Sequence, residues 1–145
     1  MGIRRRGREA AFQIMYGLEF SGLKPEEAIP IFFEQMGIPH PSREFVIRLV
    51  NGITENLETI DAILARHSHN WKIHRMNSVD KNILRVGIYE LMFCPDIPTK
   101  VAINEAIELG KKYGTSESGA FINGIMDTVA KEVRGGDGDK KDNNC

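Results

Sequence analysis

An apolar stripe with the period of a helix runs from residue 42 to residue 68, and it constrains the fold more than any other feature. Its positions recur three and four residues apart, as one face of a helix requires. The members of the stripe are Val46, Leu49, Val50, Ile53, Leu57, Ile60 and Leu64. The spacing predicts one long helix over 42–68, although Gly52 lies within it.

Five further segments carry the same period and are bounded by Pro, Gly or capping residues. They are 4–20; Pro25 to Gly37; Asn77 or Ser78 to Pro95; Pro98 to Gly114; and Thr115 or Ser116 to Gly135 and Gly136. No segment sustains the two-residue alternation of a strand. The sequence therefore predicts an all-α fold of about six to seven helices.

Two segments lack a clear period. His67 to Met76 contains the only tryptophan, Trp71, and we interpret it as an irregular connector at the junction of two halves. Residues 134–145 are almost entirely Gly, Asp, Lys and Asn, a composition that cannot bury enough apolar surface to fold. We expect one folded domain over 1–133, followed by a disordered polar tail.

Composition narrows the class of protein. The 145 residues are 41% hydrophobic and 27% charged with a net charge of -1, which is ordinary for a globular domain. No segment approaches the roughly 18 apolar residues needed to cross a bilayer, and no leader follows the first arginines. The two cysteines, Cys94 and Cys145, do not make a disulfide framework. We expect a cytoplasmic protein with reduced thiols and no membrane contact.

The N-terminus is strongly basic although the whole chain is nearly neutral. Four arginines lie among the first eight residues with no acidic residue between them: Arg4, Arg5, Arg6 and Arg8. On a helix that turns about 100° per residue, Arg4, Arg5 and Arg8 share an arc of about 100°, and Arg6 points away. Phe12 and Tyr16 lie within about 20° of the line through Arg5. The pattern predicts a basic ridge that continues into aromatic side chains.

Such a ridge suits single-stranded RNA. Arginine pairs bidentately with phosphate, and an exposed aromatic ring offers a stacking platform worth roughly 1 to 3 kcal/mol per base. The alternative is a solvated helix start in which Phe12 is buried and Tyr16 lies at the edge of the core. Arginines at a helix N-terminus oppose the macrodipole by roughly 0.3 to 1 kcal/mol each, so folding alone does not account for them.

Catalytic and metal sites find little support. His67, His69 and His74 lie near Trp71, but no Cys or clear carboxylate in that segment completes a zinc ligand set. Cys94 has no nearby His to activate it, and we expect a buried structural thiol. Neither phosphate-cradling motif, G-x-x-x-x-G-K-[ST] or G-x-G-x-x-G, is present. The sequence therefore predicts no metal, no cofactor and no enzymatic activity.

Four blocks of sequence resemble the NusB family of transcription antitermination proteins. The first is Arg4 to Gln13 with Tyr16, and the others are Val79 to Leu91, Pro98 to Leu109, and Phe121 to Asp127. They occur in the family's order over residues 4 to about 132. The resemblance implies two helical sub-bundles within one domain, an N-terminal one over about 4–70 and a C-terminal one over about 77–132.

The resemblance also implies a function. NusB proteins bind the boxA element of ribosomal RNA leader transcripts jointly with NusE, a small-subunit ribosomal protein, in a complex that keeps RNA polymerase from terminating. Carried over to this chain, the RNA contacts would be the arginines of the first helix, Tyr16, and the start of the last helix at Glu117, Ser118 and Phe121. The NusE surface would include Asp80, Lys81, Tyr89 and Thr99.

Two positions depart from the family pattern. Gly7 stands where a helix former is usual and costs up to about 1 kcal/mol, so we expect a first turn that is frayed until RNA binds. Glu117 would repel phosphate unless it accepts a hydrogen bond from a base.

Two other functions stay open. One is a helical protein-interaction module or homodimer with incidental RNA binding, since an exposed apolar strip serves a second copy as well as NusE. The other is a ribosomal RNA methyltransferase, because some of those enzymes carry a NusB-like domain. A chain of 145 residues leaves no room for their cofactor-binding fold, so we favour the RNA-binding factor.

Overall fold

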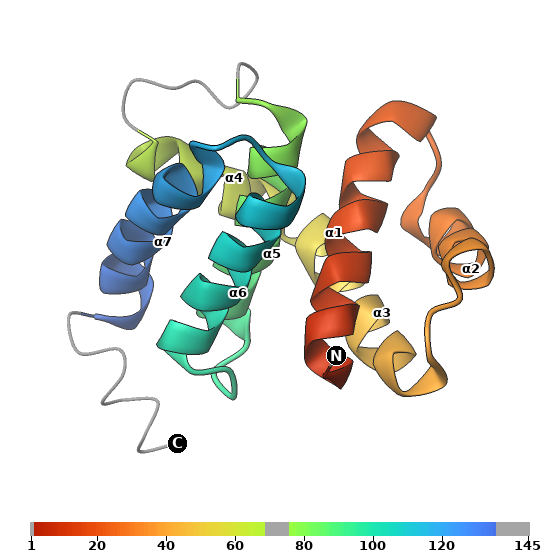
Figure 1. Ribbon diagram of the computed structural model, residues 1–145. Coiled ribbons are helices and arrows are strands. Elements are labelled where there is room, and N and C mark those ends of the chain that lie inside the picture. Colours follow the sequence, from red (N-terminus) through yellow and green to blue (C-terminus); the bar gives the residue numbers. More distant parts are fainter. Residues whose placement is uncertain (1, 69–75, 136–145) are drawn as a thin grey trace. The chain divides into compact units, whose positions relative to one another are not determined.

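Seven helices make up the part of the chain that the structure, a computed structural model, describes, namely residues 2–68 and 76–135 (Figure 1). They are α1 (Ile3–Ser21), α2 (Pro25–Met36), α3 (His40–Glu55), α4 (Leu57–His67), α5 (Ser78–Phe93), α6 (Thr99–Tyr113) and α7 (Ser118–Arg134). Over these ranges the structure holds no strand, which confirms the all-α prediction. None of these helices is both long and apolar enough to cross a bilayer.

Local signals set most helix ends where the sequence predicts them. Gly22 and Gly37 adopt the left-handed backbone, with φ of 71° and 59°, and end α1 and α2. Asn77 caps α5, because its Oδ1 accepts a hydrogen bond of 2.8 Å from the backbone N–H of Asp80. Pro25 occupies the first turn of α2, whose N-terminal N–H groups need no intrahelical partner.

The prediction of one long helix over 42–68 is wrong, because the helix is interrupted at Asn56. The Asn56 side chain donates to the Gly52 carbonyl at 2.8 Å, and its backbone N–H donates to the carbonyls of Gly52 and Ile53. These bonds satisfy the last carbonyls of α3, and α4 begins at the next residue. The apolar period continues across the break, which is why the stripe read as one helix.

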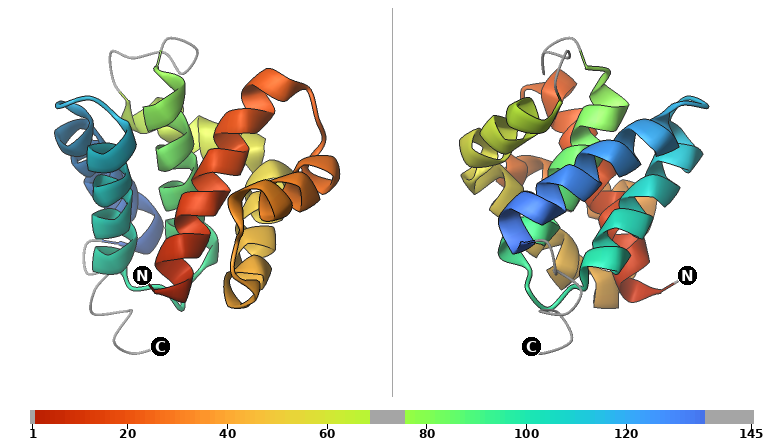
Figure 2. Two further views of the ribbon diagram at one scale, coloured as in Figure 1. Left: turned by 45° about the vertical axis from the view of Figure 1, so that its right-hand side comes forward. Right: turned by 90° about the vertical axis from the view of Figure 1, so that its left-hand side faces the viewer.

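The break also separates two compact units, which divide between Asn56 and Leu57. In the first unit, α1 packs mainly on α3, and α2 contacts both. In the second, α5, α6 and α7 pack on one another, and α4 packs on α5 and α7 (Figure 2). The boundary near Trp71 expected from the sequence therefore differs from the structural one, because α4 belongs to the second unit. Trp71 itself and the tail from 136 to 145 lie outside the described residues.

The second unit is closely packed around Gly87. A Cβ at this position would lie 2.6 Å from Met126 Cε and 3.5 Å from the Cβ of Ala106, so the glycine lets α5 approach both other helices. The largest fully buried side chains of this unit include Ile83, Leu84, Ile88, Ile97, Ile122 and Met126. The helices that follow the turns before α5 and α7 are therefore closely packed against each other.

Candidate nucleic-acid interface

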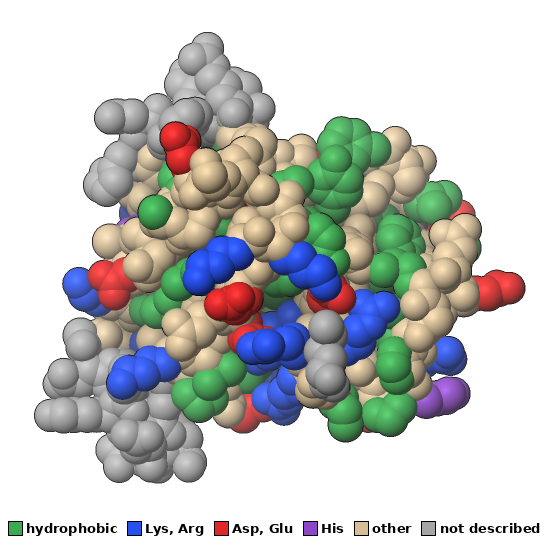
Figure 3. Space-filling view, in the orientation of Figure 1, with side chains coloured by type: hydrophobic (Ala, Val, Ile, Leu, Met, Phe, Trp, Pro, Cys, Tyr) green, Lys and Arg blue, Asp and Glu red, His purple; other side chains and the backbone are tan. Residues whose placement is uncertain are grey.

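The N-terminal arginines divide into two groups in the structure. Arg4 and Arg5 are exposed at the start of α1, whereas Arg8 is only 4% exposed. Arg6 points elsewhere, as the helical wheel predicts, because it pairs with Glu9 at 3.2 Å and donates to the Met36 carbonyl at 3.4 Å. Figure 3 shows Lys and Arg side chains gathered around the start of α1.

Phe45 of α3 supports two of these arginines. The guanidinium carbon of Arg4 lies 5.0 Å from the centre of the Phe45 ring, and that of Arg8 lies 5.6 Å from it. Both distances are within the range of cation–π attraction. The ring thereby holds two positive charges on one side of α1. Sequence reasoning missed Phe45, since its contact partners lie some forty positions away.

Gly7 is a packing residue, which corrects the expectation of a frayed first turn. A Cβ on Gly7 would lie 2.8 Å from Phe45 Cδ2, so only glycine lets the ring sit this close to the helix. The first turn is also fastened by Ser42, whose hydroxyl donates to the Ile3 carbonyl at 3.0 Å. The helix therefore begins at Ile3 and reaches Gly7 in regular form.

The aromatic half of the ridge differs from the prediction. Phe12 is 3% exposed and offers no stacking face, so the alternative of a buried Phe12 holds. Tyr16 is 39% exposed, and the next exposed ring on α1 is Phe20, whose centroid lies 5.1 Å from that of Tyr16. The available stacking surface thus runs from Tyr16 to Phe20. Phe20 follows Tyr16 by four residues, a spacing that places the two on one helix face.

The second predicted RNA-binding region lies at the start of α7. One of its three residues is buried, and the other two are at least partly exposed. Ser118 is buried, and its Oγ accepts from the Thr115 backbone N–H at 2.9 Å. Glu117 is exposed, and Phe121 is half-buried. The backbone N–H of Glu117 donates to Thr115 Oγ1 at 3.2 Å. Thr115 therefore shapes the turn, but α7 starts at Ser118 and not directly after Thr115 or Ser116.

Most of the predicted NusE surface is buried in this structure. Asp80, Tyr89 and Thr99 each have small exposed fractions, and Lys81 is half-buried. Thr99 accepts a hydrogen bond of 3.1 Å from Arg134. The Tyr89 ring lies 5.2 Å from that of Phe93, which is exposed, as is Val101 on α6. These two exposed apolar residues are additional candidates for a partner surface.

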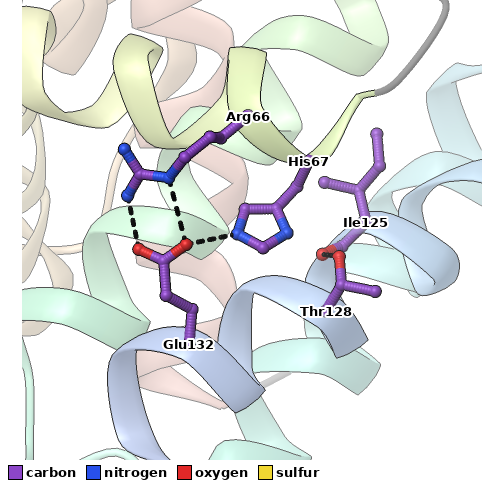
Figure 4. Close-up of polar contacts among 5 residues, drawn as sticks. All are labelled: Arg66, His67, Ile125, Thr128 and Glu132. Atoms are coloured by element: carbon purple, nitrogen blue, oxygen red, sulfur yellow. Dashed lines mark hydrogen bonds and ion pairs between the residues drawn. The ribbon is translucent and has the colours of Figure 1, made fainter.

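The histidines and cysteine behave as ordinary structural groups where the structure describes them. His67 and Arg66 of α4 both contact Glu132 of α7, and Thr128 donates to the Ile125 carbonyl one turn earlier on α7 (Figure 4). His69 and His74 lie outside the described residues. Within residues 2–68 and 76–135 there is no group of three His, Cys, Asp or Glu side chains placed to hold a metal. Cys94 is fully buried, as predicted.

A model of the NusB family matches residues 5–131. The chain belongs to the NusB family. The resemblance carried by the four sequence blocks is thereby confirmed. A curated NusB relative, the transcription antitermination protein NusB of Desulfatibacillum aliphaticivorans, is 45% identical over 129 residues, which cover 89% of this chain and 90% of that protein.

Solved NusB structures share the fold. NusB of T. maritima matches with a TM-score of 0.84 at 38% identity, covering 98% of this chain and 97% of that one. A crystal structure of the antitermination factors NusB and NusE in complex with double-stranded RNA matches with a TM-score of 0.84 at 28% identity, covering 91% of this chain and 98% of that one. The sequence comparison and the structure comparison therefore both support the NusB fold of this chain.

Proposed function

We propose that this chain is a transcription antitermination factor that binds boxA RNA of ribosomal RNA leader transcripts together with NusE. In the antitermination complex it helps keep RNA polymerase from terminating. The observation that carries the proposal is the basic start of α1, where Arg4 and Arg5 are exposed and Phe45 supports Arg4 and Arg8. The names of the relatives and the NusB–NusE–RNA complex support the same assignment.

The proposed mechanism is binding and recruitment, with no catalytic step. Guanidinium groups pair with RNA phosphates. Because this pairing releases counterions from the RNA, the binding affinity falls as the salt concentration rises. Tyr16 provides a stacking face at the other end of the same helix, which a single-stranded segment uses without a fixed sequence. Because the target is nascent RNA, the activity belongs where RNA polymerase works, in the cytoplasm.

A salt titration tests the role of the arginines. The variant carrying Arg4→Ala and Arg5→Ala should bind boxA RNA more weakly. The plot of log K against log salt should become shallower, with the magnitude of its slope smaller by about 1.4, because each lost contact to single-stranded RNA reduces that magnitude by about 0.7. A matched control replaces Lys111 and Lys131, both exposed on the second unit, with Ala and removes the same charge. Equal affinities and slopes for the two double variants would refute the arginine assignment.

A homodimer is the second candidate function, favoured by the exposed apolar end of α1. Phe20 is 66% exposed, and Leu23 and Ile31 of the same unit are exposed as well. A patch of exposed apolar side chains often marks a site where a partner binds. Light scattering on size-exclusion fractions, with and without NusE and boxA RNA, separates the readings. A dimer that Phe20→Ser dissociates without changing RNA affinity would assign this surface to self-association.

A further inference from the structure

The turn between α5 and α6, residues 94–98, is bound by a side chain from the end of α7. Arg134 is only 9% exposed, and its guanidinium donates at 2.7 to 3.1 Å to four backbone carbonyls and one hydroxyl. The acceptors are the carbonyls of Glu90, Leu91, Cys94 and Ile97 and the Oγ1 of Thr99. An arginine has five N–H donors, so these five bonds are enough to engage all of them.

The five acceptors belong to three consecutive parts of the chain. Two of the carbonyls lie in the last turn of α5, where helix carbonyls run out of intrahelical partners. Two others belong to the turn itself, and Thr99 is the first residue of α6. The positive charge of Arg134 also lies at the negative end of the α5 dipole, which favours it there. One side chain therefore fixes the end of α5, the turn and the start of α6 relative to one another.

Two exposed apolar side chains flank this turn. Phe93 is the last residue of α5, and Val101 lies in the first turn of α6. The Phe93 ring contacts that of Tyr89, at 5.2 Å between centroids, and the family resemblance places Tyr89 on the NusE surface. The apolar pair thus continues that surface. Because Phe93 and Val101 stand on different helices, their relative position depends on the conformation of the turn.

We propose that Arg134 is a positioning residue for NusE binding, which holds the turn in the conformation that presents Phe93 and Val101 together. The inference rests on the proposed function and adds a buried residue that acts through the surface. A partner surface that is ordered before binding loses less conformational entropy when the complex forms. Thr99, which the resemblance places on the NusE surface, then acts through Arg134, because its side chain is 7% exposed and its hydroxyl accepts from the guanidinium.

Arg134→Lys tests the proposal, because lysine keeps the charge but has three donors and no planar fork. Purified NusE is titrated into each protein and its affinity is measured by calorimetry. The variant should bind NusE about tenfold more weakly, since side chains beside the loosened turn must be ordered on binding. The titrations are made at a temperature at which circular dichroism shows every variant to be folded.

A core variant separates positioning from stability. Met126 is fully buried on α7, about two turns before Arg134, and Met126→Ala should destabilise the second unit as other large-to-small core substitutions do. It does not change the bonds to the turn, so the folded variant should bind NusE as tightly as the wild type. A residue that contributes only to stability would likewise leave the NusE affinity of the folded protein unchanged.

A double-mutant cycle tests whether Thr99 acts through Arg134. Thr99→Val removes the hydroxyl that accepts from the guanidinium and should weaken NusE binding about threefold. In the Arg134→Lys background the same substitution should have no further effect. Thr99→Ser restores the hydroxyl and should recover most of the affinity. If Arg134→Lys does not fold, the comparison of Thr99→Val with Thr99→Ser carries the test.

A matched pair of surface variants tests the apolar pair. Val101 and Ile47 are each 40% exposed, and Ile47 lies on α3 of the first unit. Val101→Ser should weaken NusE binding, whereas Ile47→Ser should leave it unchanged.

Three results would overturn the inference. The first is that folded Arg134→Lys binds NusE as tightly as the wild type and Met126→Ala do. The second is that Thr99→Val weakens binding equally in both backgrounds, which would make Thr99 a direct contact. The third is that Val101→Ser and Ile47→Ser bind NusE equally well. Failure of the wild type to bind NusE would instead refute the proposed function.

Discussion

Arg4 and Phe45 form a contact that joins the basic start of α1 to α3, with the guanidinium carbon 5.0 Å from the ring centre. Arg8 approaches the same ring at 5.6 Å. An arginine on a mobile side chain loses conformational entropy when it binds phosphate, and a ring that already restricts it reduces that loss. Phe45 therefore acts on RNA binding through the arginines it positions.

Replacing Phe45 with Leu should weaken RNA binding about fivefold, because the exposed Arg4 loses the ring that restricts it and must be ordered on binding, at a cost of roughly 0.5 to 1.5 kcal/mol. The variant keeps an apolar side chain, so the free energy of unfolding should fall by only about 1 kcal/mol. Fluorescence anisotropy with boxA RNA and urea unfolding measure the two effects.

The chain offers a matched control for this substitution. Phe33 of α2 lies under Arg43 in the same way, with 5.2 Å between the guanidinium carbon and the ring centre. Phe33→Leu removes an equivalent contact that involves no arginine of α1 and should leave RNA affinity unchanged. If both variants bind RNA equally well, Phe45 has only a structural role.

The fold was largely predictable because its signals are local. The apolar period, Pro25, Gly22 and the Asn77 cap act over a few residues, so they can be read along the chain. The break at Asn56 was not predictable in this way. The apolar period continues on both sides of Asn56, and asparagine is also found inside helices. Nothing in the sequence pattern therefore shows that the Asn56 side chain bonds to an α3 carbonyl and ends the helix.

The site was less predictable because packing decides which side of a helix is exposed. The wheel places Phe12 close to both the arginine ridge and the buried face, and only the structure shows that it belongs to the core. The support of Arg4 by Phe45 joins segments that are far apart in sequence. A periodic pattern in one helix carries no information about such pairs.

Gly7→Ala should lower the free energy of unfolding by about 1 kcal/mol. Alanine gains up to about 1 kcal/mol of helix propensity, but its Cβ would lie 2.8 Å from Phe45 Cδ2, and overpacking of this kind costs about 1 to 3 kcal/mol. Gly124→Ala is the control, since no atom lies within 4 Å of its added Cβ on α7. That variant should be more stable than the wild type, and urea unfolding of the pair shows whether packing or propensity governs Gly7.

Arg134→Met should lower the free energy of unfolding by about 3 kcal/mol. The buried guanidinium of Arg134 donates to the Ile97 carbonyl at 2.7 Å and to Thr99 Oγ1 at 3.1 Å. It also donates to the carbonyls of Glu90, Leu91 and Cys94, at 2.9 to 3.1 Å. Hydrogen bonds from a charged donor contribute roughly 1.5 to 3 kcal/mol each, but they are not additive.

Lys131→Met, on the exposed side of the same helix, is the control for Arg134→Met and should change stability by less than about 0.5 kcal/mol. Thermal unfolding compares the two variants. Equal melting temperatures would mean that Arg134 does not fasten the turn between α5 and α6. A large loss for Arg134→Met alone would show that the end of α7 holds that turn in place.

The ion pair between α4 and α7 should make stability depend on acid pH. Hydrogen bonds from Arg66, and next from His67, lower the pKa of Glu132 to about 2 from its ordinary value of 4.5. Since the folded state favours the ionised carboxylate, this contribution is fully present above about pH 4.5 and is lost as pH falls toward 2. Melting temperatures of Glu132→Gln should therefore lie below those of the wild type at pH 7 and approach them at pH 3. Glu34→Gln, an exposed carboxylate on α2, is the control. A gap between Glu132→Gln and the wild type that stays constant from pH 7 to pH 3 would show that the charge of Glu132 does not stabilise the fold.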